Sequence, residues 1–281
     1  KTKEGLVRMC ACRGTAGFAH VSCLAEQAKI LLAEAEENNL GDKACAERWK
    51  RWYMCSMCEQ DYHGDVACAL GWACWKTYVG RPEPDQFRRC AMTHLGGGLL
   101  LGRHLQDALT VQEAELAMQQ RLGASEEHML ALQHNLANSY SDLGFLEKSL
   151  SMRKVTYSGT LKLLGKENEH TFLTANSYAS SLLTSGRFEE VKSLLCELMP
   201  VARRTLGEGH ELTLKMRKAY ARALYENKAA TLDDLHEAVT TLEDSERTAR
   251  RVFGNAHPNT AGIEHSLRNA RAALRARETQ A

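Results

Sequence analysis

Glycines that recur at a fixed interval place the strongest constraint on how this chain can fold. Two series of three are each spaced by 42 residues, namely Gly102, Gly144 and Gly186, and Gly123, Gly165 and Gly207. An interval of this length is typical of stacked units, since one unit cannot bury its apolar face without its neighbours. It predicts two helices of about four turns per unit, with glycine where the chain turns tightly. We therefore expect a mainly α chain, with an α-solenoid over residues 84–281.

Four units and a capping helix fill this region. The units are predicted at about 84–123, 124–165, 166–207 and 208–254, and the capping helix at 258–277. An aliphatic–alanine pair, a large residue and a glycine recur, as in Leu136-Ala137-x-x-Tyr140-x-x-x-Gly144. This pattern is similar to the tetratricopeptide repeat (TPR). The joint Leu206-Gly207…His210…Thr213 resembles the longer kinesin-light-chain variety, whereas HEAT repeats lack the alanine-to-glycine signature.

The TPR resemblance implies a right-handed superhelix whose first helices line a concave groove. Equivalent inward positions carry polar side chains that could bind a partner: His134, Asn176 and Lys218, and Asn138, Ser180 and Arg222. Asparagine and lysine at such positions can hydrogen-bond an extended peptide backbone. The alternative is an ordinary hydrated helix surface, and the sequence does not decide between the two.

Cysteine is concentrated ahead of the repeats, because nine of the ten cysteines lie between Cys10 and Cys90. The residues that can bind zinc form three close pairs: Cys10 and Cys12, His20 and Cys23, and Cys55 and Cys58. Two thiolates on one short turn reach a tetrahedral ion without strain. A secreted disulfide scaffold would carry cysteines throughout. Metal binding in a reducing intracellular compartment, cytoplasmic or nuclear, is the better interpretation.

The order and spacing of these pairs over about residues 9–64 resemble the last three ligand pairs of the RING-CH (RING-variant) zinc finger. The surrounding residues also match the family: Arg13-Gly14-Thr15, Phe18, Leu24, Trp52 and Tyr62. A PHD finger uses the same ligand order. However, it usually has more residues between its third and fourth cysteines and a shorter gap to the histidine, so the spacing favours RING-CH.

The resemblance implies a crossed arrangement of two zinc ions in the complete domain. Carried over, Cys10, Cys12, Cys55 and Cys58 bind one ion, which gives one complete site in this chain. His20 and Cys23 belong to the second site, whose other ligand pair has no counterpart before Cys10. Because the chain starts at Lys1 rather than methionine, we expect that pair to lie upstream. His63 and Cys45 are weaker substitutes.

The remaining features divide the chain and exclude several functions. A small zinc-stabilised finger is predicted at 1–64 and a helical joint at 65–83, ending at Gly80-Arg81-Pro82. A net charge of +1 argues against a nucleic-acid-binding face, and no apolar run approaches the roughly 20 residues of a membrane span. Gly96-Gly97-Gly98 lacks the strand-loop-helix context and the lysine of a phosphate loop, so a weakened helix is predicted there.

The sequence thus favours a RING-CH-type E3 ubiquitin ligase, or a fragment of one, that positions a ubiquitin-charged conjugating enzyme while the repeats hold a protein partner. No side chain of the chain itself needs to be catalytic in such a ligase. Trp52 is a candidate contact for the conjugating enzyme, with burial in the core as the alternative. The rival functions are a non-catalytic zinc-binding TPR adaptor and a PHD-like histone reader.

Overall fold

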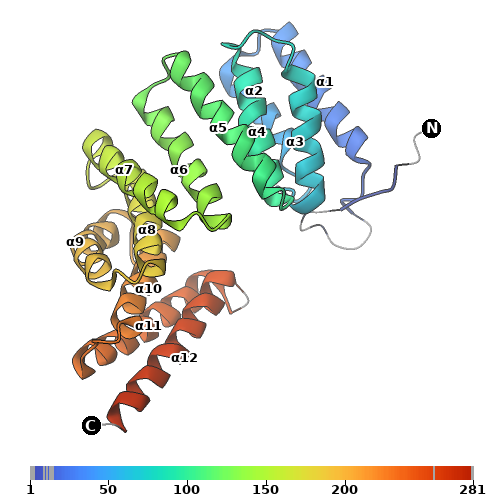
Figure 1. Ribbon diagram of the computed structural model, residues 1–281. Helices are drawn as coiled ribbons and strands as arrows, with labels where there is room; N and C mark the ends of the chain where they lie inside the picture. The colour runs from blue at the N-terminus through green and yellow to red at the C-terminus, as the bar shows by residue number, and fades with distance from the viewer. Residues whose placement is uncertain (1–3, 9, 11, 13–15, 256, 280–281) are drawn as a thin grey trace. The chain divides into compact units, whose positions relative to one another are not determined.

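The computed structural model describes residues 4–8, 10, 12, 16–255 and 257–279, and helices dominate these ranges (Figure 1). The described chain contains no strand beyond two isolated bridges, Val7 with Ala19 and Met54 with Asp61. It divides into two compact units, residues 1–143 and 144–281. The expectation of a mainly α chain is confirmed.

Unit 1 holds the cysteine-rich region and the helices up to residue 143. Its helices are α1 (Val21–Glu37), α2 (Gly41–Trp49), the 3-10 turn η1 (Lys50–Trp52), α3 (Gly64–Tyr78), α4 (Gln86–Leu101), α5 (Leu105–Arg121) and α6 (Glu126–Asp142). The first core of this unit is aromatic: Trp49 stacks on Phe87, and Tyr78 contacts both rings. Arg81 makes two bonds to the Glu36 carboxylate and lies over Tyr78, which joins the ends of α1 and α3.

Helix α4 runs without a break through Gly96, Gly97 and Gly98, where the sequence predicts a weakened helix. These glycines let α4 approach its neighbours closely. A Cβ at Gly98 would lie 2.6 Å from the Ala67 carbonyl oxygen of α3, and one at Gly96 would lie 3.2 Å from Gln112 of α5. At Gly97 a Cβ would meet nothing within 4 Å.

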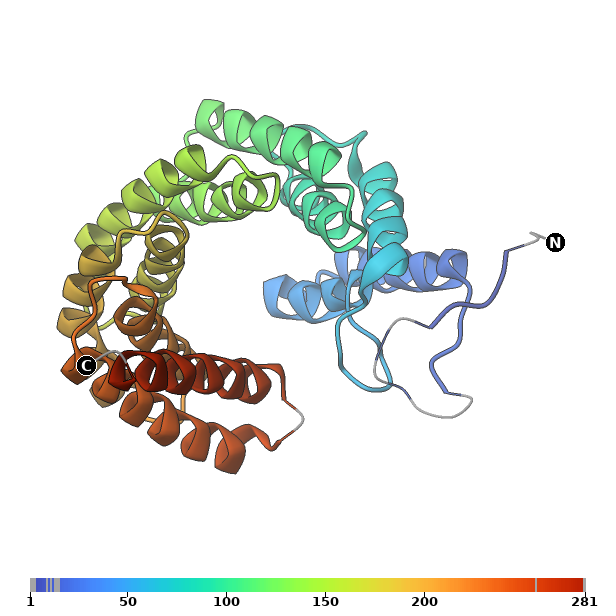
Figure 2. The ribbon, with the colours of Figure 1, turned by 60° about the horizontal axis from the view of Figure 1, so that its bottom comes forward.

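Unit 2 consists of helix pairs followed by a last helix. They are α7 (Leu146–Leu164), α8 (Glu169–Thr184), α9 (Phe188–Leu206), α10 (Glu211–Glu226), α11 (Leu232–Phe253) and α12 (Pro258–Glu278). Consecutive helices pack against each other, as α11 and α12 do in Figure 2, and α10 also packs against α8 and α12. The first helices of successive pairs therefore lie side by side and share one apolar core, which includes Phe172, Leu195 and Met216.

The joints between pairs explain the repeated sequence pattern. Helices α7 and α9 end at Gly165 and Gly207, whose φ values of 80° and 94° suit glycine. Six residues after Gly165, the Thr171 hydroxyl closes the turn by donating to the Gly165 carbonyl at 2.7 Å. The histidines at the joints are not gathered as ligands. His210 instead caps α10 by accepting the Leu212 N–H.

We find no helix in the described ranges long and apolar enough to cross a membrane.

Candidate metal centre

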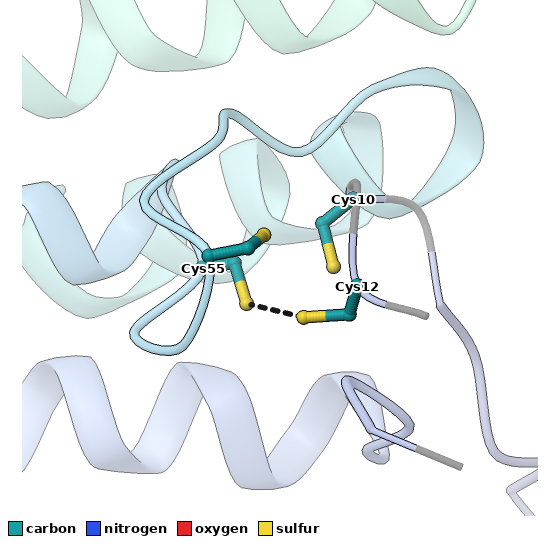
Figure 3. A group of neighbouring side chains, drawn as sticks. Cys10, Cys12 and Cys55 are labelled. Atoms are coloured by element: carbon teal, nitrogen blue, oxygen red, sulfur yellow. Dashed lines mark hydrogen bonds between the residues drawn. The ribbon is translucent and has the colours of Figure 1, made fainter. Parts of the chain in front are cut away.

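Four cysteines from two distant stretches meet in unit 1. The sulfur atoms of Cys10, Cys12, Cys55 and Cys58 all lie within 4.8 Å of one another. Cys12 Sγ is 3.7 Å from Cys55 Sγ, although the two residues are 43 positions apart (Figure 3). This is the one group of three or more possible metal ligands found among the residues that the structure describes.

A tight loop presents the second pair. Around it the chain closes on itself through a bond from the Tyr62 N–H to the Tyr53 carbonyl at 2.7 Å and the bridge of Met54 with Asp61. At the tip, the Cys55 N–H donates to the Gln60 carbonyl at 2.9 Å. We name residues 53–62 the cysteine loop. It holds Cys55 buried and turns both sulfurs toward the first pair.

The first pair lies on a segment that doubles back over itself. Val7 and Ala19 exchange backbone hydrogen bonds of 2.9 and 3.0 Å, which brings the turn at Gly17 beside the thiols. A Cβ at Gly17 would lie 2.6 Å from Cys12 Cβ and 3.2 Å from Cys10 Sγ. Only glycine fits this cradle, because its φ of 77° is also left-handed. The Arg13-Gly14-Thr15 part of the motif lies outside the described residues.

The electrostatics around Cys10, Cys12 and Cys55 favour one negative charge but resist several. Burial acts to raise the pKa of Cys55, but the N–H groups of Cys58 and Met57 outweigh it and lower the pKa to about 7. At Cys12, burial and the neighbouring thiols raise the pKa to about 12. Burial also raises the pKa of Cys10. A cation among the sulfurs would stabilise the thiolates and offset the burial that otherwise resists several negative charges there.

The donor set fits a four-thiolate metal site. A tetrahedral zinc ion with Zn–S bonds of about 2.3 Å places its sulfurs about 3.8 Å apart, close to the 3.7 Å between Cys12 and Cys55. A disulfide needs about 2.05 Å, and both cysteines are free thiols. Four cysteine sulfurs this close to one another are compatible with zinc.

The other predicted ligands lie apart from this group. His20 Nδ1 and Cys23 Sγ are 3.7 Å from each other at the start of α1, where they form a pair. No additional cysteine or histidine in the described ranges completes that pair as a metal-binding group. His63 lines a pocket with Cys10 but directs Nδ1 to the Asp61 carbonyl, and Cys45 packs on the aromatic core.

Trp52 is completely buried, so it offers no surface to a partner. Its ring packs with Leu32, Cys74 and Tyr78, while its carbonyl accepts a bond from His94 Nε2 at 3.1 Å. This burial agrees with the alternative that the sequence left open. Trp52 is therefore a core residue and not a docking contact.

The six groove candidates lie on first helices of the repeats and are half-buried. They are His134 and Asn138 on α6, Asn176 and Ser180 on α8, and Lys218 and Arg222 on α10. Ser180 and Arg222 use their polar groups locally. Ser180 Oγ donates to the Asn176 carbonyl, and Arg222 pairs with Glu226 at 2.7 Å. Lys218 has no salt bridge among the described residues, and burial followed by Arg222 and Lys215 lowers its pKa.

The sequence analysis missed two features of unit 1. Gly17 gave only a weak signal, a glycine between two ligand pairs. The bond from His94 to the Trp52 carbonyl, just before the cysteine loop, gave none, because the two residues are distant in sequence. Burial lowers the pKa of His94 to about 4, so the ring is neutral and donates its Nε2 proton.

The paired helices, their glycine-terminated joints and the stacked first helices define a TPR-like α-solenoid. No model of a known protein family matches the chain, and no curated protein matches it by sequence. Among solved structures, the chain is similar to the nearly identical TPR-like repeats of a Podosopora anserina protein assigned as a kinesin light chain. That match has a TM-score of 0.55 at 18% identity and covers 84% of this chain and 99% of the other.

The chain is also similar to BtubC (BKLC) from P. vanneervenii, with a TM-score of 0.53 at 12% identity, covering 93% of this chain and 91% of that one. A point variant of the Podosopora anserina repeats matches with a TM-score of 0.54 at 19% identity, covering 83% of this chain and 97% of that one. These likenesses establish the fold.

Proposed function

We propose that the chain is a zinc-binding, RING-CH-type ubiquitin ligase, or part of one, whose TPR-like repeats hold a protein partner. The convergence of Cys10 and Cys12 with Cys55 and Cys58 carries this proposal, because the RING-CH resemblance implies that these two pairs share one ion. Zinc bound there would cross-link the start of the chain to the cysteine loop and stiffen the finger at residues 1–64.

A ligase of this class works by positioning. The resemblance implies that the finger docks a ubiquitin-charged conjugating enzyme and orients its thioester toward a substrate lysine, so the rate gain comes from proximity. With Trp52 buried, the apolar side chain best placed for docking is Met57, which lies between Cys55 and Cys58 and is 67% exposed. We assign Met57 as the contact on the cysteine loop.

The repeats would bind the protein partner. Their first helices carry the half-buried polar positions, and Lys218 adds a cation that no described carboxylate neutralises. A carboxylate on a bound peptide would satisfy it. The finger, the joint at 65–83 and the repeats at 84–281 form the proposed functional division, whereas the compact units of the fold divide within the repeats, after Leu143. A reducing intracellular location, cytoplasmic or nuclear, fits the free thiols.

A second function, a non-catalytic adaptor, is favoured by the isolated His20–Cys23 pair. Two ligands do not hold a structural zinc ion tightly, so the described residues furnish one four-ligand site where a complete RING-CH finger has two. In this alternative the metal only stiffens the finger, and the repeats assemble partners.

Metal analysis and a ubiquitin-transfer assay distinguish the two functions. We expect about one zinc per chain by mass spectrometry and ubiquitin chains with at least one member of a panel of conjugating enzymes. Met57→Ala should reduce chain formation while zinc content is unchanged. Cys55→Ser should lose both, and Cys196→Ser, which changes an exposed thiol in unit 2, should lose neither. Inactivity across the panel with zinc bound would favour the adaptor, and absence of bound metal would refute both.

A further inference from the structure

Two cavities follow one face of α4 inside unit 1. The first, of about 340 Å³, lies at the start of the helix, and the second, of about 370 Å³, lies at its end. Cys90 and Thr93 line both, so the cavities adjoin. Together they form a groove, which we name the α4 groove. It is separate from the four cysteines and from the six groove candidates on α6, α8 and α10.

The cavity at the end of α4 is apolar, and the cysteine loop forms one of its walls. Tyr53 and Tyr62 come from that loop, Trp49 from α2 and Leu101 from α4. Leu101 is 51% exposed. Such a cavity suits an aromatic or aliphatic side chain, because insertion of that side chain would remove apolar surface of both the cavity and the side chain from water.

Gly97 opens this cavity. A glycine inside a helix costs about 1 kcal/mol relative to alanine, and close packing repays that cost at Gly96 and Gly98. No such packing exists at Gly97, where a Cβ would point into open space. Gly97 lines the apolar cavity. Its missing side chain therefore enlarges the cavity instead of bringing two helices together.

The cavity at the start of α4 is polar and carries an uncompensated positive charge. Arg89 lines it and makes one long bond, 3.5 Å to Gln119 Oε1. The described residues provide Arg89 with no salt bridge, and its buried Nε has no acceptor among them. Ser125, the N-cap of α6, and His128, in its first turn, form the opposite wall. The dipole of that helix adds to the preference for a negative group.

We propose that the α4 groove binds an extended segment of a protein partner that carries an acidic side chain for Arg89 and an apolar side chain for the cavity at Gly97. Arg89 and Gly97 are eight positions apart and so lie about 12 Å from each other along the helix axis. An extended peptide covers that distance in about four residues. The segment would thus have its two anchors about four positions apart, and it would touch both the cysteine loop and the first repeats. This inference holds whether or not the chain is a ligase.

Fluorescence anisotropy with the full chain tests the proposal. The probes are labelled twelve-residue glycine–serine peptides in which one aspartate and one phenylalanine stand two to eight positions apart. We expect the tightest binding at a spacing of four, and about ten-fold weaker binding when either anchor is replaced by alanine. Arg89→Gln should remove the effect of the aspartate, and Gly97→Leu that of the phenylalanine.

Matched variants control for general effects. Arg121→Gln changes an exposed arginine of the same unit that lines neither cavity, and it should bind like the wild type. Gly97→Ala should keep most of the cavity and most of the affinity. Thermal unfolding verifies that each variant is folded.

Three outcomes would overturn the proposal. The first is affinity that does not depend on spacing, or no binding at all. The second is an equal effect of Arg89→Gln and Arg121→Gln. The third is a concentration-dependent dimer in sedimentation that Gly97→Leu abolishes, which would identify a second copy of the chain as the occupant.

Discussion

Adding one methyl group at Gly98 or at Gly97 tests the packing of α4 most directly. The two glycines are neighbours in the same helix, so Gly98→Ala and Gly97→Ala are chemically matched. A Cβ at Gly98 would lie 2.6 Å from the Ala67 carbonyl oxygen and 3.2 Å from its carbonyl carbon. These are backbone atoms of α3 and cannot rotate away, whereas a Cβ at Gly97 meets open space.

The structure gives the sign and size of both effects. Replacing a helix-interior glycine by alanine stabilises a helix by about 1 kcal/mol, and this gain applies to both variants. At Gly98 the methyl must also separate α3 from α4, and overpacking of this kind costs about 1–3 kcal/mol or more. We expect Gly97→Ala to raise the free energy of unfolding by about 1 kcal/mol. Gly98→Ala should lie about 1–3 kcal/mol below Gly97→Ala.

Intrinsic fluorescence provides a selective assay, because all four tryptophans lie in unit 1, at positions 49, 52, 72 and 75. Thermal unfolding followed at these residues should separate the midpoints of the two variants by roughly 4–10 °C, with Gly98→Ala the lower. If Gly98→Ala unfolds at the same temperature as Gly97→Ala or above it, the close approach of α3 and α4 is refuted.

Three further predictions concern the metal, pH and a half-buried ion pair. Treatment with a strong chelator, or Cys55→Ser, should lower the midpoint of the tryptophan transition by about 10 °C or more, and an unchanged midpoint would exclude a structural ion. Glu115, a buried residue of α5, accepts a bond from the Thr93 hydroxyl, and burial raises the pKa of its carboxyl group to about 7. The stability contributed by its protonated form is therefore lost as pH rises from 4.5 to 7. Burial lowers the pKa of His94 to about 4, so the stability contributed by its neutral form is lost as pH falls from 6.5 to 4. The two pH dependences oppose each other between pH 4.5 and 6.5. In urea titrations, the free energy of unfolding of Glu115→Gln should rise by about 2–3 kcal/mol relative to the wild type as pH rises across that window, and that of His94→Gln should fall by a similar amount. Variants whose stability changes with pH in parallel with the wild type would contradict the assignment. Arg81→Lys keeps the charge but loses one of the two bonds to Glu36, so it should lower the free energy of unfolding in urea titrations by about 1 kcal/mol. An unchanged free energy of unfolding would show that the two-bond geometry does not contribute to stability.

Much of the helical architecture could be predicted from spacing alone. The glycines at the joints, such as Gly165 and Gly207, occupy left-handed backbone positions that few other residues adopt, so their interval marks the ends of helices directly. The last helix was expected at 258–277, and α12 runs from Pro258 to Glu278. Local rules sufficed here because each joint is closed by residues near it in sequence.

Features that depend on contacts between distant segments could not be predicted in the same way. The glycines at 96–98 suggest a weak helix by propensity, but tight packing of α4 against α3 and α5 overrides that preference. Trp52 is more often a core residue than a docking contact in such a pattern, but both roles stay open until the positions of α3 and α4 are known. The cysteine spacing, in contrast, indicated which pairs share an ion only through a family resemblance, and the 3.7 Å between Cys12 and Cys55 is the geometric observation that supports it.

The separation of the cysteine pairs along the chain has a consequence for biosynthesis. Helices α1 and α2 lie between Cys12 and Cys55, so an ion held by all four thiols closes a loop around both helices. A growing polypeptide cannot complete that closure until Cys58 has emerged from the ribosome. Capture of the ion by all four thiols would therefore be a checkpoint passed only after both helices have been synthesised.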